Sequence, residues 1–298
     1  MTNNDDGTFT SGSAANLGAA CEPESPGSRI TSCARNISDL FEGLFNRSEA
    51  GLPPVIVSFQ EATRWKDLQS ISESSLKTMA SNHHKSGNAH LVTFFHKSAY
   101  TPEVEIKGEF SKGRPWQLLI FREGLIYVNL HLGHHKSAAY VAKKLSAGLL
   151  KAIPVEEERQ KLSSYRIIMA GDFNDHSHPG VLTQLVPFAD AGIQTQVSAG
   201  DTFNTCCDTD TTTRPWEGTK SGDYVLDSAS PASLSVPFGY DYTKLYSDHL
   251  PVVGRLKPMA SWNFPASFDQ EKVKEFGVYL VPVLSTRLKL WGGNPKVS

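Results

Sequence analysis

The sequence has little cysteine and no surplus of charge, and both absences narrow the class of protein. Four cysteines in 298 residues do not make a disulfide framework, because Cys206 and Cys207 are adjacent while Cys21 and Cys33 lie far away. The 29 basic and 31 acidic residues give a net charge of -2. This balance excludes a histone-like basic binder, and the share of apolar residues excludes a disordered polyelectrolyte.

Long apolar runs and a basic leader are also missing. The longest apolar-rich stretch, at 276–284, is broken by Pro282 and is much shorter than the about 20 residues of a membrane-spanning helix. The N-terminal residues carry acids where a signal peptide carries bases. We therefore expect no stable membrane insertion, and a soluble intracellular protein of the cytoplasm or nucleus.

What the sequence does contain is typical of a globular α/β domain. Apolar residues make up 39% of the chain, enough for a sizeable core. Short β-branched or aromatic runs predict buried strands, and stretches with a three- to four-residue apolar spacing predict helices. The expected strands include 55–59, 90–95, 117–121, 125–131 and 166–170, and the expected helical segments cover about 29–46, 66–80, 137–152 and 179–187. Since several strands are joined by hairpins, we expect mixed sheets in one α/β domain.

Polar clusters lie where the expected strands begin or end. They are Phe59-Gln60-Glu61, Asn129-Leu130-His131, Gly171-Asp172-Phe173-Asn174, Gly222-Asp223-Tyr224 and Ser247-Asp248-His249. A carboxylate at the rim of a sheet keeps its charge because it can reach water or a metal. A single aspartate in such a place is more often a turn former or a helix cap, but five clusters with the same placement favour a site. Hard oxygen donors favour Mg²⁺ or Mn²⁺, and no zinc-binding spacing is present.

The order of these motifs resembles the endonuclease/exonuclease/phosphatase family. FQE, NLHL, GDFN, GDYVLDS and SDHLPV follow one another, and the resemblance covers about residues 8–256. It implies the deoxyribonuclease-I-like fold, a four-layer α/β/β/α sandwich of two mixed sheets. It also divides the chain into a loose N-terminal lead (1–8), the family domain (9–256) and a C-terminal extension (257–298). For the extension, an added edge strand and the docking of a partner both remain open.

The resemblance further implies one divalent metal, Mg²⁺ or Mn²⁺, and an attacking water. Glu61 is then the principal metal carboxylate, and Asp248 and Asn16 complete or support the metal shell. Asp172 positions and deprotonates the water. Asn174 orients the nucleophile or the phosphate.

The remaining implied roles concern the phosphate. His131 and His249 face the scissile phosphate, and Asp223 holds the ring of His249 and fixes its tautomer. Asn88 resembles a family asparagine that contacts the first catalytic histidine. Arg114 lies where many relatives carry a phosphate-gripping arginine, although a solvated hairpin residue is an equal alternative.

The expected activity is Mg²⁺-dependent hydrolysis of phosphodiester bonds in nucleic acid, DNA or RNA, by an endonuclease or exonuclease. Only the groove of such an enzyme must be basic, and six residues could supply one: Lys112, Arg114, His131, His134, His135 and Lys136. Trp65, Trp116 and Trp216 could stack on a base, although a single tryptophan is more often a packing residue. Two alternatives remain, namely a hydrolase of small or lipid phosphoesters and a non-catalytic binding module. A binding module would be expected to have lost the metal-binding or water-positioning residues, whereas this sequence retains them.

Overall fold

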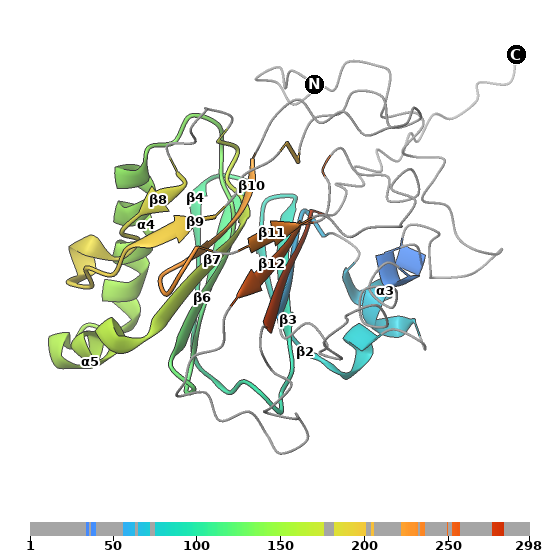
Figure 1. Cartoon of the computed structure of the whole chain (residues 1–298), viewed down its shortest axis with the longest axis horizontal. Helices are drawn as coiled ribbons and strands as arrows, with labels where there is room; N and C mark the ends of the chain where they lie inside the picture. The colour runs from blue at the N-terminus through green and yellow to red at the C-terminus, as the bar shows by residue number, and fades with distance from the viewer. Residues whose placement is uncertain are drawn as a thin grey trace, which may run out of the picture.

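Two β-sheets lie face to face in the structure, and helices cover their outer faces (Figure 1). The computed structural model describes residues 34–35, 37–39, 56–62, 65–71, 75–175, 182–200, 204–205, 222–231, 233–235, 249, 252–256 and 276–282. No helix in these ranges is long and apolar enough to cross a membrane. The architecture is the predicted α/β/β/α sandwich.

One sheet has six strands in the order β11-β12-β13-β1-β3-β2. The strands are β1 (Ile56–Gln60), β2 (Ala80–Ser86), β3 (Ala89–Phe95), β11 (Ser233–Ser235), β12 (Val252–Leu256) and β13 (Phe276–Pro282). β1 and β13 are parallel and the other pairs are antiparallel, so the sheet is mixed as expected. β13 lies inside the sheet, between β12 and β1, and not at its edge. The sheet therefore continues beyond the boundary that the sequence placed at 256.

The other sheet has seven strands in the order β4-β5-β6-β7-β10-β9-β8. The strands are β4 (Pro102–Ser111), β5 (Arg114–Phe121), β6 (Leu125–His131), β7 (Arg166–Asp172), β8 (Gln184–Leu185), β9 (Val197–Ala199) and β10 (Asp223–Asp227). β6 and β7 are parallel, and the remaining pairs are antiparallel. The predicted hairpin of 117–121 and 125–131 is confirmed as β5 and β6.

The helices lie on either side of this pair of sheets. They are α3 (Trp65–Ser70), α4 (Ala138–Ala152) and α5 (Glu156–Lys161), with 3₁₀ turns η1 (Ser75–Thr78), η2 (Leu162–Ser164) and η3 (Ala189–Ala191), and 34–35 and 37–39 are also helical. α4 begins at Ser137, whose Oγ accepts a hydrogen bond from the backbone N–H of Tyr140 at 3.2 Å. The helical stretch predicted near 66–80 corresponds to α3 and η1 in its described part, and only its end is wrong, since β2 already begins at Ala80. The helical turn predicted at 179–187 is also wrong in its described part, which contains β8.

Three apolar clusters correspond to the three interfaces between the four layers. The first joins α4, through Val141, Leu145 and Leu149, to the outer face of the seven-stranded sheet. The second lies between the sheets, and the third joins α3 and the helical residues near 37 to the six-stranded sheet. In the first cluster a Cβ at Gly108 or Gly148 would lie 2.3 Å from the ring of Trp116. Trp116 is therefore a packing residue.

The space between the sheets changes from apolar to polar along strand β6. Alternate residues of a strand share a face, so Leu125, Tyr127, Asn129 and His131 all point towards the six-stranded sheet. Leu125 and Tyr127 belong to the apolar cluster between the sheets, and Asn129 donates to the carbonyl oxygen of Val92 in the opposite sheet at 3.2 Å. The titratable side chain of His131 therefore lies at the polar end of this space, where β6 ends.

A buried ion pair lies at the other end of the same strands. The guanidinium of Arg166 donates to both carboxylate oxygens of Asp227, at 2.8 and 2.6 Å, and both side chains are at most 1% exposed. Removing one partner of a buried pair leaves the other charge without compensation. We expect Asp227→Asn to lower the free energy of unfolding by about 3–5 kcal/mol in urea titration. The exposed pair Arg122–Glu103 is the control, and Glu103→Gln should cost less than about 1 kcal/mol. If the two variants lost the same free energy of unfolding, burial would not be what makes the Arg166–Asp227 pair costly to break.

Candidate active site

Three neighbouring strands bring one titratable residue each to the same edge of the seven-stranded sheet. His131 ends β6 and Asp172 ends β7, and because these strands are parallel the two residues are register partners. Asp223 begins β10, which is antiparallel to β7, and its register partner is again Asp172. The sheet therefore places His131, Asp172 and Asp223 side by side.

Gly171 is required for the close approach of these strands. A Cβ at this position would lie 2.0 Å from the carbonyl oxygen of Leu130. Real Cβ atoms do not approach a carbonyl oxygen so closely, so a larger residue would push β6 and β7 apart. The glycine of GDFN thus has a steric role directly beside Asp172.

Asp172 is buried and held by Asn174. The backbone N–H of Asn174 donates to Asp172 Oδ1 at 2.8 Å, and its side-chain Nδ2 donates to Oδ2 at 2.9 Å. The same Nδ2 donates to the carbonyl oxygen of Leu132 at 2.7 Å, which fixes the amide. Burial raises the pKa of Asp172 to about 7, and the neighbouring Asp223 acts in the same direction, whereas His249 opposes them. A carboxyl group with a pKa near neutrality is suited to take a proton from water.

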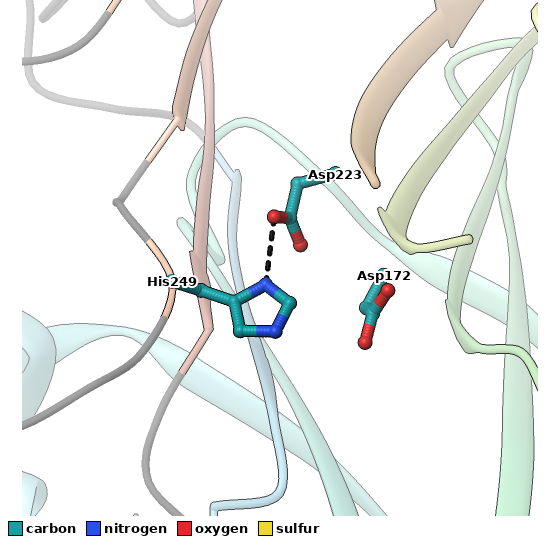
Figure 2. A group of neighbouring side chains, drawn as sticks. All are labelled: Asp172, Asp223 and His249. Atoms are coloured by element: carbon teal, nitrogen blue, oxygen red, sulfur yellow. Dashed lines mark hydrogen bonds and ion pairs between the residues drawn. The ribbon is translucent and has the colours of Figure 1, made fainter. Parts of the chain in front are cut away.

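His249 and Asp223 form a hydrogen-bonded pair beside Asp172. His249 Nδ1 lies 2.8 Å from Asp223 Oδ2, and Thr205 Oγ1 donates to the same oxygen at 2.6 Å. Since a carboxylate can only accept, Nδ1 carries the proton and the tautomer of His249 is fixed. Figure 2 shows the other ring nitrogen on the side of Asp172. One donor atom of each of Asp172, Asp223 and His249 lies within 4.8 Å of the others.

His131 lies between Asp172 and Glu61. Its Nε2 accepts a hydrogen bond from Arg114 Nη1 and lies 3.4 Å from Asp172 Oδ2, while its Nδ1 lies 3.8 Å from Glu61 Oε1. The side chain is only 4% exposed. Burial and then the positive charge of Arg114 hold the pKa of His131 well below its ordinary value. The ring is therefore neutral at physiological pH.

Glu61 follows β1 in an unusual backbone conformation. Its φ of 57° lies in the left-handed region, which costs a non-glycine residue energy and is enriched at functional sites. The backbone N–H of the next residue, Ala62, donates to the carbonyl oxygen of His90 at 3.1 Å, which holds this bend. The Glu61 side chain is 39% exposed, so its carboxylate can reach a ligand from solvent.

The donor atoms at this edge fit a hard divalent cation. Glu61, Asp172 and Asp223 supply carboxylate oxygens, which Mg²⁺ and Mn²⁺ prefer. Asp223 Oδ1 is buried and has no hydrogen-bond partner among the described residues, so a positive ligand there would be stabilising. His249 could contribute only its Nε2, because its Nδ1 is bonded to Asp223.

The structure brings most of the predicted site residues together. Glu61, His131, Asp172, Asn174, Asp223, His249 and Arg114 meet at one edge. Asn16 and Asp248 lie outside the described residues. Asn88 lies in the exposed turn between β2 and β3, and no hydrogen bond joins it to His131 in the part of the chain described. The side chain of Arg114, for which no such contact was predicted, bonds His131.

Some residues of the site were not predicted from the sequence. Thr205 bonds Asp223, and no motif in the sequence around this threonine singles it out. Gln60 and Asn129 stand inside the FQE and NLHL motifs without an assigned role, yet they bond one another between the sheets. The signal in the sequence is their position, since Gln60 directly precedes Glu61 and Asn129 lies two residues before His131.

Comparisons with known proteins give distant similarities. No family model matches the sequence. An uncharacterized protein, L684, of Acanthamoeba polyphaga mimivirus is 27% identical over 252 residues, which cover 82% of this chain and 48% of that protein. This chain thus spans about half the length of that relative.

Solved structures show similarity at 13–14% identity over 74% of this chain. Truncated Caenorhabditis elegans TDP2 has a TM-score of 0.46 and is covered over 88% of its chain. An endonuclease/exonuclease/phosphatase family protein of Bacteroides thetaiotaomicron has a TM-score of 0.44 and is covered over 85%. The mannosyl-6-phosphatase Bt3783 of the same species has a TM-score of 0.43 and is covered over 90%. These values are too low to assign an activity. The described sheets and helices themselves form the deoxyribonuclease-I-like sandwich that the motifs imply.

Proposed function

We propose that this protein is a phosphoester hydrolase of the endonuclease/exonuclease/phosphatase type that cleaves phosphodiester bonds of nucleic acid with Mg²⁺ or Mn²⁺. The observation that carries the proposal is the arrangement of Asp172 against the His249–Asp223 pair. Glu61 and His131 lie beside these groups at the same edge. A base, an oriented imidazole and a metal carboxylate are groups that together can hydrolyse a phosphoester.

The protein's own residues have distinct tasks in this reaction. Asp172 takes a proton from the attacking water, because burial has raised its pKa towards neutrality. Asn174 holds both oxygens of that carboxylate in place. Arg114 donates hydrogen bonds to the phosphate oxygens as negative charge develops, and His249, whose Nδ1 is held by Asp223, does so from Nε2 in its imidazolium form.

Glu61 would hold the divalent cation, together with Asp248 and Asn16 outside the described residues. When bound, the cation neutralises negative charge on the phosphate and on the leaving oxygen. This role fits the exposed carboxylate of Glu61, since a ligand must be reachable from solvent.

Basic turns beside the site favour a polyanionic substrate over a single phosphate. The β2–β3 and β4–β5 turns lie against each other, as shown by the distance of 3.8 Å that a Cβ at Gly87 would have from Gly113 Cα. A Cβ at Gly133 would likewise lie 3.6 Å from Lys136 and 3.8 Å from Arg114. Lys112 in the β4–β5 turn and His134 and His135 after β6 are exposed, as is Lys85 near the end of β2. Phosphates flanking the cleaved bond can therefore meet positive charge.

Cleavage of end-labelled single- and double-stranded DNA and RNA tests the proposal. We expect cutting with Mg²⁺ or Mn²⁺ and none with chelator. The logarithm of kcat/KM should fall with the logarithm of salt concentration, with a slope of about -0.7 to -0.9 for each phosphate contacted. The double variant Lys112→Ala/Lys136→Ala should flatten this slope by about 2.

The control is Lys151→Ala, an exposed lysine at the far end of α4, which should leave the slope unchanged. Hydrolysis of bis(p-nitrophenyl) phosphate without any cutting of polymers would replace the nuclease by a hydrolase of small or lipid phosphoesters. A folded wild type that hydrolyses neither substrate would contradict both.

A further inference from the structure

A chain of five buried polar side chains crosses back and forth between the two sheets. Gln60 Nε2 donates to Asn129 Oδ1 at 2.7 Å, and Asn129 Nδ2 donates to Thr93 Oγ1 at 3.1 Å. The Thr93 hydroxyl donates to Gln117 Oε1 at 2.8 Å, and Gln117 Nε2 donates to Asn82 Oδ1. The chain runs from β1 to β6, then to β3, β5 and β2. Each link joins one sheet to the other.

Stability alone gives no reason for this polar chain. All five side chains are at most 5% exposed, and apolar residues of similar volume would fill the same space without a desolvation cost. Gln60 Oε1 is buried without a hydrogen-bond partner among the described residues, which is a further cost. Such a network instead fixes the alignment of the two sheets, because each donor meets its acceptor only when the sheets are correctly placed against each other.

Two members of this polar chain, Gln60 and Asn129, lie close in sequence to residues of the candidate site. Gln60 immediately precedes Glu61, and Asn129 lies two residues before His131 on the same face of β6. Asn129 Nδ2 also lies 3.5 Å from the carbonyl oxygen of Phe59, so it contacts the backbone that leads to Glu61. Glu61 and His131 come from different sheets, and their separation of 3.8 Å depends on how the sheets are placed against each other.

We infer that the Gln60–Asn129 hydrogen bond is a positioning device that sets Glu61 against His131, with Thr93 holding the amide of Asn129 from the other side. The inference rests on the proposed function, in which Glu61 is the metal carboxylate. Gln60 and Asn129 themselves do not touch substrate. Positioning residues of this kind typically change metal affinity or activity by about 10- to 100-fold when replaced.

The structure offers a matched control for this device. Ser58 Oγ and Tyr127 OH form an equally buried hydrogen bond of 2.6 Å between the same two strands. Ser58 lies two residues before Gln60, and Tyr127 two residues before Asn129. Tyr127→Phe therefore removes an inter-sheet hydrogen bond of similar burial, but at a greater distance from the site.

The test compares Gln60→Met with Tyr127→Phe. Methionine keeps the length of the side chain and removes its hydrogen bonds. We expect Gln60→Met to weaken Mn²⁺ binding, measured by electron paramagnetic resonance, by about 10-fold and to lower kcat by about 10- to 100-fold. KM for a small diester should stay within about 3-fold, and Tyr127→Phe should leave metal affinity and kcat within the same limit.

Thr93→Val gives a second measurement if Gln60→Met does not fold. It should weaken Mn²⁺ binding in the same direction but by a smaller factor, because it loosens Asn129 without removing the bond to Gln60. If Gln60→Met or Thr93→Val binds Mn²⁺ as Tyr127→Phe does while the wild type is active, the positioning role is overturned and the proposed function stands. If the wild type binds Mn²⁺ but hydrolyses no phosphoester, the proposed function fails, and the metal affinities of the variants still decide the positioning role.

Discussion

Replacing Asp172 by asparagine is expected to lower kcat/KM by about 10³-fold while the protein still folds. The amide oxygen of the new side chain can still accept from the backbone N–H of Asn174, and only the hydrogen bond from Asn174 Nδ2 is lost. The variant cannot take a proton from water. Steady-state kinetics on the substrate found by the cleavage assay measure the effect, and turnover at the wild-type rate would contradict the role of Asp172 as the base.

The same substitution has a predictable effect on stability in chelator. Folding raises the pKa of Asp172 from 3.8 to about 7, so between these values the unfolded chain releases a proton that the folded protein retains. The wild type therefore loses stability relative to Asp172→Asn as pH rises through this window, and the difference is constant above about 7. Thermal unfolding at a series of pH values should show the advantage of the variant growing from pH 4 to pH 7. A difference in Tm that does not change with pH would contradict the raised pKa.

His249 and Asp223 are expected to act as one unit. His249→Ala should lower kcat/KM by about 10³- to 10⁴-fold, and Asp223→Asn by about 10²- to 10³-fold, because the pair orients one imidazole. Since Asp223 acts through His249, the double variant should be no slower than His249→Ala alone. Kinetics of the four proteins at one metal concentration give this double-mutant cycle.

The cycle also separates two roles of Asp223. Its Oδ2 holds His249 and Thr205, while its buried Oδ1 has no hydrogen-bond partner among the described residues. If the losses of the two single variants multiply in the double variant, Asp223 has a role of its own, as a metal ligand through Oδ1. Mn²⁺ affinity of Asp223→Asn checks this directly. Thr205→Val is the mild control, because it removes one donor and keeps the carboxylate.

Much of the fold could be predicted because strands and hairpins are marked by local patterns. The apolar runs of β1, β6 and β7 are buried on both faces, so they read as continuous β-branched stretches in the sequence. The predicted helix over 137–152 is confirmed as α4, which has a serine cap and apolar residues at four-residue spacing. The polar strand β2 has no such pattern, and a helix was predicted up to its first residue.

The candidate site could be predicted in part for the same reason. Glu61, His131, Asp172 and Asp223 all lie directly at strand ends, and strand ends of one sheet meet at its edges. The contact of Arg114 with His131 was not predicted, because β5 and β6 place these residues together only through their pairing. The assigned roles of Asn88, Asn16 and Asp248 stay predictions.

The sequence by itself determined the motif order, the mixed sheets and the edge at which titratable residues gather, since these depend on residues close together along the chain. Tertiary structure alone decided that β13 lies between β12 and β1, that Thr205 bonds Asp223, and that Gln60 bonds Asn129. Gln60 and Asn129 are 69 positions apart, and nothing local specifies their partner. The physical reason is that a buried amide finds its partner only when two sheets pack face to face, which is a property of the whole fold.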